Sequence, residues 1–357
     1  MNKKNGEENE EFKIIVDTIK IKFSGMGGNF EEKDNFITKI LQERYVISVE
    51  EDPDFLFYSV NSSDYLNFDC VRIFYTAENI VPDFNICDYA IGFHYLNFAD
   101  RYIRYPLYLV DGFRAYAGDD YALNLQLALQ KHKIEDDILS RKPEFCSFVY
   151  SNAEAAECRG AMFDALSRYK DVNSAGRYLN NIGRPLDNKL KFQKKHKFVI
   201  AFENTSTPGY TTEKIVHAFA AGAIPIYWGN PDITREFNPG SFINCHDFGL
   251  TEKGEQEVIA KIVEEVKRLD QDDKAYMEKL RTPAFTSEND VEMQRKIFKR
   301  FLFHIFEQNM EKAYRRNRFY WGERYERKQR IGNKFYWQCR RVIPIRDEFR
   351  KLFRRNK

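Results

Sequence analysis

The sequence predicts an α/β fold with two domains and a separate C-terminal tail. At 357 residues the chain is long enough for two domains with sizeable cores. Residues 197–230 alternate between an apolar run, a polar loop, a helical pattern and a second apolar run, which predicts a βαβ unit. Short runs rich in β-branched and aromatic residues recur on both sides of this unit, as in an α/β protein.

The first domain is predicted within residues 12–150. Strand-like alternation in Phe12 to Phe23 leads into a glycine-rich turn at residues 24–28 and then into a helical pattern near residues 36–41. The glycines do not have the GxGxxG spacing of a dinucleotide site, so we interpret them as a turn joining strand to helix. Residues 50–59 and 70–75 each contain a short buried strand.

The second domain begins with the predicted strand at residues 145–150 and contains the βαβ unit. In that unit, residues 198–202 and 224–228 are the strands, and Thr211 or Thr212 caps the helix between them. An amphipathic pattern then predicts a helix over 255–269, and residues 298–306, apolar on nearly every side, predict a packed helix that completes the domain. We therefore divide the chain into residues 1–143, residues 144–310 and a tail of residues 311–357.

Polar residues gather where the predicted strands end. In parallel α/β units, ligands bind at the carboxyl ends of the strands, where the helix N-terminus points. Glu78 follows one strand, and Arg159 lies in a loop just before a helix, where its guanidinium suits a phosphate. On position alone, a solvated acid and a surface arginine remain the ordinary interpretations. Around the central unit this edge holds Glu203, Asn204, Tyr210, Glu213 and Lys214.

Composition excludes several classes of protein. The polar N-terminus has no apolar signal region, and the longest nearly apolar run, residues 218–229, is shorter than the roughly 18 residues of a membrane span. Six scattered cysteines without CxxC spacing argue for reduced thiols and against a metal cage or disulfide frame. We therefore expect a cytoplasmic protein.

The tail differs electrostatically from the rest of the chain. Residues 311–357 contain 17 Lys and Arg against 5 Asp and Glu, while the remainder is net acidic. Pro344 can open a last helix whose apolar face, with Phe349 and Leu352, opposes basic residues. This pattern predicts a helix lying on an anionic membrane surface; a nucleic-acid-binding tail or a structural role are the alternatives.

Longer ordered motifs resemble those of a known family. Phe202-Glu203-Asn204, the string 210–214, Ile224-Pro225-Ile226-Tyr227-Trp228-Gly229 and Phe237-Asn238-Pro239 are similar to the signature of the α-1,3-fucosyltransferases, glycosyltransferase family ten. Residues 77–79 and 88–93 resemble the N-terminal motif of the bacterial members. The matching segments span roughly residues 70–250, and the ordered string from 198 to 248 is far more specific than one short motif.

The resemblance implies a GT-B fold, with two Rossmann-like domains facing a cleft, and inverting transfer of L-fucose from GDP-fucose. The expected acceptor is the 3-OH of GlcNAc in N-acetyllactosamine-like glycans, such as Lewis-type surface polysaccharide. Residues 1–143 would bind the acceptor and residues 144–310 the donor. Carried over by position, Glu78 would be the general base. The donor would be held by Arg159, Asn204, Tyr210, Glu213 and Lys214.

These roles are chemically reasonable. One carboxylate can take the acceptor proton, and Arg159 and Lys214 can neutralise the diphosphate of the leaving group. Glu213 would repel a diphosphate and is expected on the ribose hydroxyls. No Asp-x-Asp motif is evident, so we expect no obligatory metal, although a divalent cation could stimulate transfer.

The chain departs from its relatives in two ways. It shows no N-terminal anchor, which predicts a bacterial enzyme held peripherally at the inner membrane, and no leucine heptad array, which leaves a homodimer open. The alternatives are α-1,4 transfer, another sugar donor, or a non-catalytic module bound to membrane or nucleic acid; we expect no nucleic-acid partner.

Overall fold

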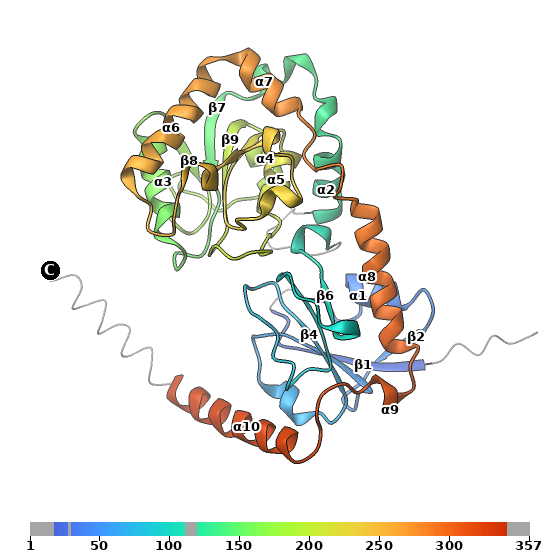
Figure 1. Ribbon diagram of the computed structural model, residues 1–357. Helices are drawn as coiled ribbons and strands as arrows, with labels where there is room; N and C mark the ends of the chain where they lie inside the picture. The colour runs from blue at the N-terminus through green and yellow to red at the C-terminus, as the bar shows by residue number, and fades with distance from the viewer. Residues whose placement is uncertain (1–17, 28–29, 111–119, 341–357) are drawn as a thin grey trace, which may run out of the picture.

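A computed structural model describes residues 18–27, 30–110 and 120–340, with side chains up to residue 335. Two parallel sheets lie one beyond the other, each flanked by helices (Figure 1). The predicted strand segment at residues 12–17 and the predicted helix after Pro344 lie outside the described residues.

The first sheet has six parallel strands in the order β2-β1-β3-β4-β5-β6. The strands predicted within 50–59 and 70–75 are confirmed as β3 and β4, and every residue of both is buried. Continuous burial is expected for parallel strands covered on both faces. The strands are β1 (Thr18–Ser24), β2 (Val46–Val49), β3 (Phe55–Tyr58), β4 (Val71–Tyr75), β5 (Tyr89–Gly92) and β6 (Tyr102–Arg104).

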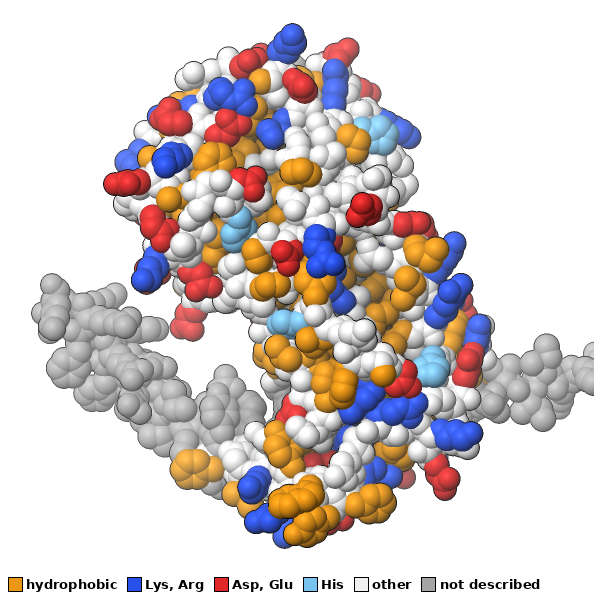
Figure 2. All heavy atoms as spheres, in the orientation of Figure 1, with side chains coloured by type: hydrophobic (Ala, Val, Ile, Leu, Met, Phe, Trp, Pro, Cys, Tyr) orange, Lys and Arg blue, Asp and Glu red, His pale blue; other side chains and the backbone are white. Residues whose placement is uncertain are grey.

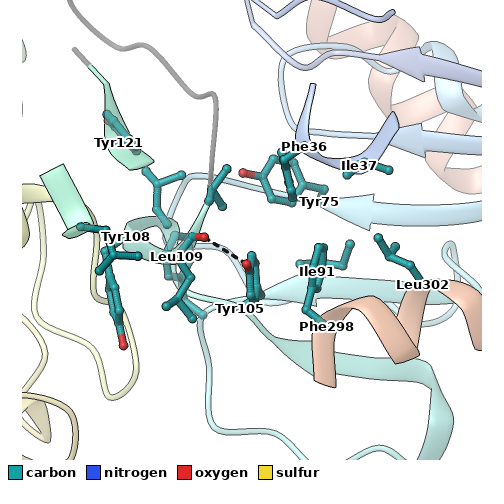
Figure 3. Packing of buried hydrophobic residues seen from close by; sticks show 14 of the residues in the cluster. Phe36, Ile37, Tyr75, Ile91, Tyr105, Tyr108, Leu109, Tyr121, Phe298 and Leu302 are labelled. Carbon is teal, nitrogen blue, oxygen red and sulfur yellow. Dashed lines mark hydrogen bonds between the residues drawn. The ribbon is translucent and has the colours of Figure 1, made fainter. Parts of the chain in front are cut away.

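Helices α1 (Phe36–Leu41) and α8 (Val291–Phe306) cover one face of this sheet (Figures 1 and 3). Phe298 of α8 stacks on Tyr105 with ring centroids 3.9 Å apart and lies 5.8 Å from Phe36. We expected residues 298–306 to complete the second domain. That expectation is wrong, because the apolar face of α8 packs on the first sheet.

The second sheet has five parallel strands in the order β11-β10-β9-β7-β8. The predicted central unit is confirmed as β9, α5 and β10, with Ile226 of β10 opposite Ile200 of β9. The strands are β7 (Glu144–Phe148), β8 (Val172–Ser174), β9 (His196–Phe202), β10 (Ile224–Trp228) and β11 (Ile243–Asn244).

Helices cover both faces of the second sheet. One face carries α3 (Glu157–Ser167), α6 (Gln256–Gln271) and α7 (Asp273–Arg281). The other carries α4 (Lys189–Gln193), α5 (Lys214–Ala220) and α2 (Tyr121–Leu129), whose Tyr121 contacts His217 of α5 with ring centroids 4.8 Å apart. Thus α2 packs on the second sheet and α8 on the first. Packing therefore does not follow the boundaries at 143 and 310, which remain a prediction about folding units.

The tail begins with α9 (Met310–Ala313) and α10 (Trp321–Arg340), and its first part is fixed to the first sheet. The buried guanidinium of Arg316 pairs with the buried carboxylate of Asp88, and Arg72 of β4 pairs with Glu326 of α10 at 2.8 Å. Our view of the tail as a separate electrostatic object is therefore wrong for residues up to 326, because these charges are partners of the sheet.

Candidate active site

The two sheets meet at the loops that follow their strands. Asn79, after β4, donates from its side-chain amide to Thr205 (2.6 Å) and Thr207 (2.7 Å), after β9. Gly209 has a φ of +88°, and a Cβ there would lie 2.4 Å from the carbonyl oxygen of Phe93. Only glycine allows this approach, which brings the ends of β4, β5 and β9 together.

Lys214 is held by Glu203, the residue that follows β9. The Glu203 carboxylate is fully buried and accepts from Lys214 Nζ (2.9 Å), from the backbone N–H of Thr212 (2.7 Å) and from its hydroxyl (2.7 Å). Gly229 makes room for it, since a Cβ at Gly229 would lie 2.4 Å from Glu203 Cγ. The N-cap of α5 is Glu213 rather than the predicted Thr211 or Thr212, and Thr212 instead bonds to Glu203.

The charge of Lys214 is stabilised in this position. Burial disfavours an ammonium group, but Glu203 and Glu213 outweigh that effect and raise the pKa of Lys214. Lys214 is therefore a cation at neutral pH.

Arg159 lies in the first turn of α3 rather than in the loop before the helix, because α3 begins at Glu157. Its buried guanidinium donates from Nη2 to the carbonyl oxygen of Glu203 (2.8 Å) and to Oδ1 of Asn204 (2.7 Å), and it lies 4.2 Å from the ring centroid of Tyr150.

The positive charge of Arg159 has no carboxylate partner in the described part of the chain. There, the hydrogen-bond partners of Arg159 are neutral oxygens, and its Nε has no partner. A buried cation without a carboxylate is costly, so an anionic ligand would be stabilised here. Asn204, half-buried, fixes the orientation of this guanidinium.

Tyr210 lies at the contact between the two halves. Its ring is buried and packs edge-on against Phe93, with centroids 4.9 Å apart. Burial raises the pKa of its hydroxyl; the charge of Lys214 lowers this pKa, and those of Glu203 and Glu78 raise it further. The hydroxyl therefore stays protonated and can donate a hydrogen bond.

Glu213 is buried directly before α5. Burial opposes its ionisation, but Lys214, Lys189 and His217 outweigh that effect and lower the pKa of Glu213 to about 2. It is therefore a carboxylate at neutral pH, an acceptor for hydroxyl or amide donors rather than for an anion.

Glu78, in the loop after β4 of the first half, lies near Lys214, Glu213 and Tyr210 of the second half. Its side chain reaches solvent, and its backbone N–H donates to the Thr76 hydroxyl at 2.9 Å. Partial burial raises the pKa of Glu78, Lys214 opposes the shift and Glu213 adds to it. A raised pKa makes the Glu78 carboxylate a stronger base. The structure thus brings all six predicted site residues to the junction of the two halves.

Glu236 is an important residue that the sequence did not indicate. Its buried carboxylate accepts from Arg104 (2.6 Å) and Tyr108 (2.7 Å), and Arg104 also donates to the carbonyl oxygen of Gly209 (2.8 Å). Glu236 therefore fixes the first half to the loop that carries Tyr210. Arg104 and Tyr108 are more than a hundred residues away in the chain, so spacing gave no signal of these contacts.

Two features are absent from the described residues. In residues 18–27, 30–110 and 120–340, no three His, Cys, Asp or Glu side chains come together as metal ligands. Within the same residues, no helix combines the length and apolarity needed to cross a membrane.

Comparison with known proteins identifies the family. Residues 21–111 match the alpha-(1,3)-fucosyltransferase FucT N-terminal domain, and residues 139–297 match the C-terminal domain of glycosyltransferase family 10 (fucosyltransferase). The alpha-(1,3)-fucosyltransferase FucT of Helicobacter pylori is 38% identical over 61% of this chain and 51% of the relative. An alpha-(1,4)-fucosyltransferase of Arabidopsis thaliana is 28% identical over 46% of this chain and 41% of the relative. The chain thus spans about half the length of these curated relatives.

Solved structures extend the match to both sheets. A crystal structure of an alpha1,3-fucosyltransferase with GDP is 32% identical, with a TM-score of 0.62 over 82% of this chain and 92% of that one. A structure with GDP-fucose has a TM-score of 0.61 over 85% and 93%. The prediction of a GT-B fold with two Rossmann-like halves is confirmed. The chain therefore belongs to glycosyltransferase family 10, the fucosyltransferases.

Proposed function

We propose that this protein is an α-1,3-fucosyltransferase that transfers L-fucose from GDP-fucose with inversion. The observation that carries the proposal is the uncompensated cation Arg159, which contacts Glu203 as Lys214 does, while the Glu78 carboxylate interacts with Lys214 from the other half. Family membership supports it, since relatives have been solved with GDP and with GDP-fucose.

In the mechanism, Glu78 takes the proton of the acceptor hydroxyl as that oxygen attacks the anomeric carbon. The bond to the GDP oxygen breaks on the opposite face of the sugar, so the configuration inverts. Negative charge grows on the diphosphate as it leaves, and Arg159 and Lys214 stabilise it more strongly than in the ground state. Their positions are fixed beforehand by Asn204 and Glu203, so little reorganisation is needed.

The remaining donor contacts follow from the charge of each group. Glu213 is ionised and accepts hydrogen bonds from the ribose hydroxyls of GDP, since it would repel the phosphates. The Tyr210 hydroxyl keeps its proton and donates a hydrogen bond to an oxygen of GDP-fucose at the junction. No step needs a metal, although a divalent cation could bind with the diphosphate.

We propose the 3-OH of GlcNAc in an N-acetyllactosamine-like glycan as the acceptor. Because one relative is an alpha-(1,4)-fucosyltransferase, transfer to the 4-OH is the second candidate. The test incubates the full chain with GDP-fucose and other GDP- and UDP-sugars against both types of disaccharide, and determines the product linkage by NMR. An α-1,3 product supports the proposal, and an α-1,4 product or another donor replaces it.

The tail is the proposed contact with an anionic membrane at the cytoplasmic face. Near the start of α10 three aromatic side chains are exposed, Phe319 (80%), Tyr320 (69%) and Trp321 (63%), beside Arg318 and Arg324. Figure 2 shows apolar and basic side chains gathered at this end of the molecule. Each basic residue near an anionic leaflet contributes about 1 kcal/mol, and the aromatic rings suit the interface.

Sedimentation with vesicles tests this contact. Removing residues 311–357 would also break the Arg316–Asp88 pair, so point variants are better. Phe319→Ser with Trp321→Ser should reduce binding to phosphatidylserine vesicles and leave transfer to soluble acceptors unchanged. Equal binding to vesicles of phosphatidylcholine alone would contradict an electrostatic contact.

A further inference from the structure

A cavity of about 280 Å³ lies beside the loop that carries Glu78. It opens at the carboxyl ends of β3 and β4, on the face of the first sheet opposite α1 and α8. Its walls come from three segments: the loop after β3, the loop after β4 and helix α10. They include Tyr58, Ser62, Tyr65, Val81, Gln329 and Asn333.

The lining suits an uncharged sugar. Tyr58 and Tyr65 stack on each other, with ring centroids 4.3 Å apart and an angle of 27° between the rings, and present an aromatic surface to the cavity. Serine hydroxyls and two side-chain amides supply both donors and acceptors, and the Asp83 carboxylate adds acceptor oxygens. Among the described residues no lysine or arginine lines the cavity, and Asp83 would repel a phosphate. An aromatic surface beside hydrogen-bonding groups matches the apolar face and hydroxyl edge of a pyranose.

The cavity is within reach of the proposed base. Ile80 lines it, and the backbone N–H of Ile80 donates to the carbonyl oxygen of Glu78 at 2.8 Å. Two residues of chain span at most about 7 Å. A short oligosaccharide can therefore extend from Glu78 to the cavity across this loop.

Helix α10 forms the outer wall and is fixed against the sheet. Glu326 pairs with Arg72, and the Tyr325 hydroxyl donates to Asp83 at 2.7 Å. One and two turns further on, Gln329 and Asn333 line the cavity, and the Asn333 side chain lies near the Tyr65 hydroxyl. The tail helix is therefore a wall of a cavity next to the site as well as a charged surface.

We propose that this cavity binds a sugar unit of the acceptor outside the disaccharide that receives fucose, so that α10 selects longer acceptors. The proposal rests on the proposed function. It predicts that an N-acetyllactosamine-type tetrasaccharide has a lower KM than the disaccharide, while kcat is similar for both.

Variants at Asn333 test the assignment. Asn333→Ala removes its side-chain amide and should raise the KM of the tetrasaccharide about 5- to 10-fold, with no change for the disaccharide. Asn333→Trp fills the cavity and should make the two KM values equal. The control is Lys328→Ala, an exposed position on the same helix, which should preserve the preference. A wild-type enzyme that uses both acceptors equally, or variants that keep the preference, would overturn the proposal.

A binding measurement that does not depend on fucose transfer tests the cavity separately from the proposed function. If the wild type transfers fucose to no acceptor, the proposed function fails. The cavity is then tested by saturation-transfer NMR with the tetrasaccharide alone. Binding that Asn333→Trp abolishes and Lys328→Ala preserves supports the cavity, and binding unaffected by Asn333→Trp refutes it.

Discussion

Replacing Glu78 by glutamine removes the proposed base and leaves the donor site intact. The substitution preserves side-chain size at a position that reaches solvent, so the free energy of unfolding should change by no more than about 0.5 kcal/mol. General base catalysis contributes about 10²- to 10⁴-fold. We therefore expect kcat to fall by that factor, which corresponds to about 2.7–5.4 kcal/mol of transition-state stabilisation.

The pH dependence of kcat/KM tests the role of Glu78 as general base independently. Its pKa lies above the ordinary 4.5, and the carboxylate is the active form. In the wild type, kcat/KM should fall as the pH drops through that raised pKa, and in Glu78→Gln this acidic limb should be absent. Calorimetric titration with GDP should give a dissociation constant within about threefold of wild type, because Glu78 makes no proposed contact with the nucleotide.

The matched control is Glu213→Gln, the same change at the buried acid of the donor side. It should weaken GDP binding about 10-fold or more, since hydrogen bonds to a charged acceptor are worth about 1.5–3 kcal/mol. The reasoning is refuted if Glu78→Gln keeps kcat within tenfold of wild type, or if its acidic limb remains.

Three further outcomes are expected. Arg159→Lys should lower kcat about 10²- to 10³-fold with folding retained, because one ammonium cannot replace the forked contacts, and a thermal melt beside the transfer assay checks both effects. Arg316→Leu leaves the Asp88 carboxylate buried without its cation and should cost about 3–5 kcal/mol in urea unfolding, whereas Arg318→Leu, at a more exposed ion pair, should cost under 1 kcal/mol. Glu213 has a depressed pKa, so its stabilisation is present above about 4.5 and is lost as the pH falls towards about 2; Glu213→Gln should flatten the stability profile in that window.

Local patterns predicted the elements that carry the site. Residues 198–202 of β9 and all of β10 are buried in the sheet, so their apolar runs are unbroken in the sequence. The end of a parallel strand also predicts where its polar neighbours lie, which is why Glu203 and Lys214 were expected at one edge.

Long-range pairing was not predictable in the same way. The apolar run at residues 298–306 predicts that α8 is packed, but not that Phe298 stacks on Tyr105, nearly two hundred residues earlier. Net charge likewise counted Arg316 as part of a basic tail, although Asp88 neutralises it inside the protein. Pairing energies depend on the three-dimensional neighbour, and spacing along the chain carries no information about it.

The position of α8 has a consequence for synthesis of the chain. The first sheet ends at Arg104, but the cover that α1 begins on one of its faces is complete only when Phe306 of α8 has been made, about 200 residues later. At 5–20 residues per second, the ribosome needs roughly 10–40 s to cover that interval. During this time the apolar face stays open to chaperones and to other nascent chains, and the first half can complete its core only after the second half has been translated.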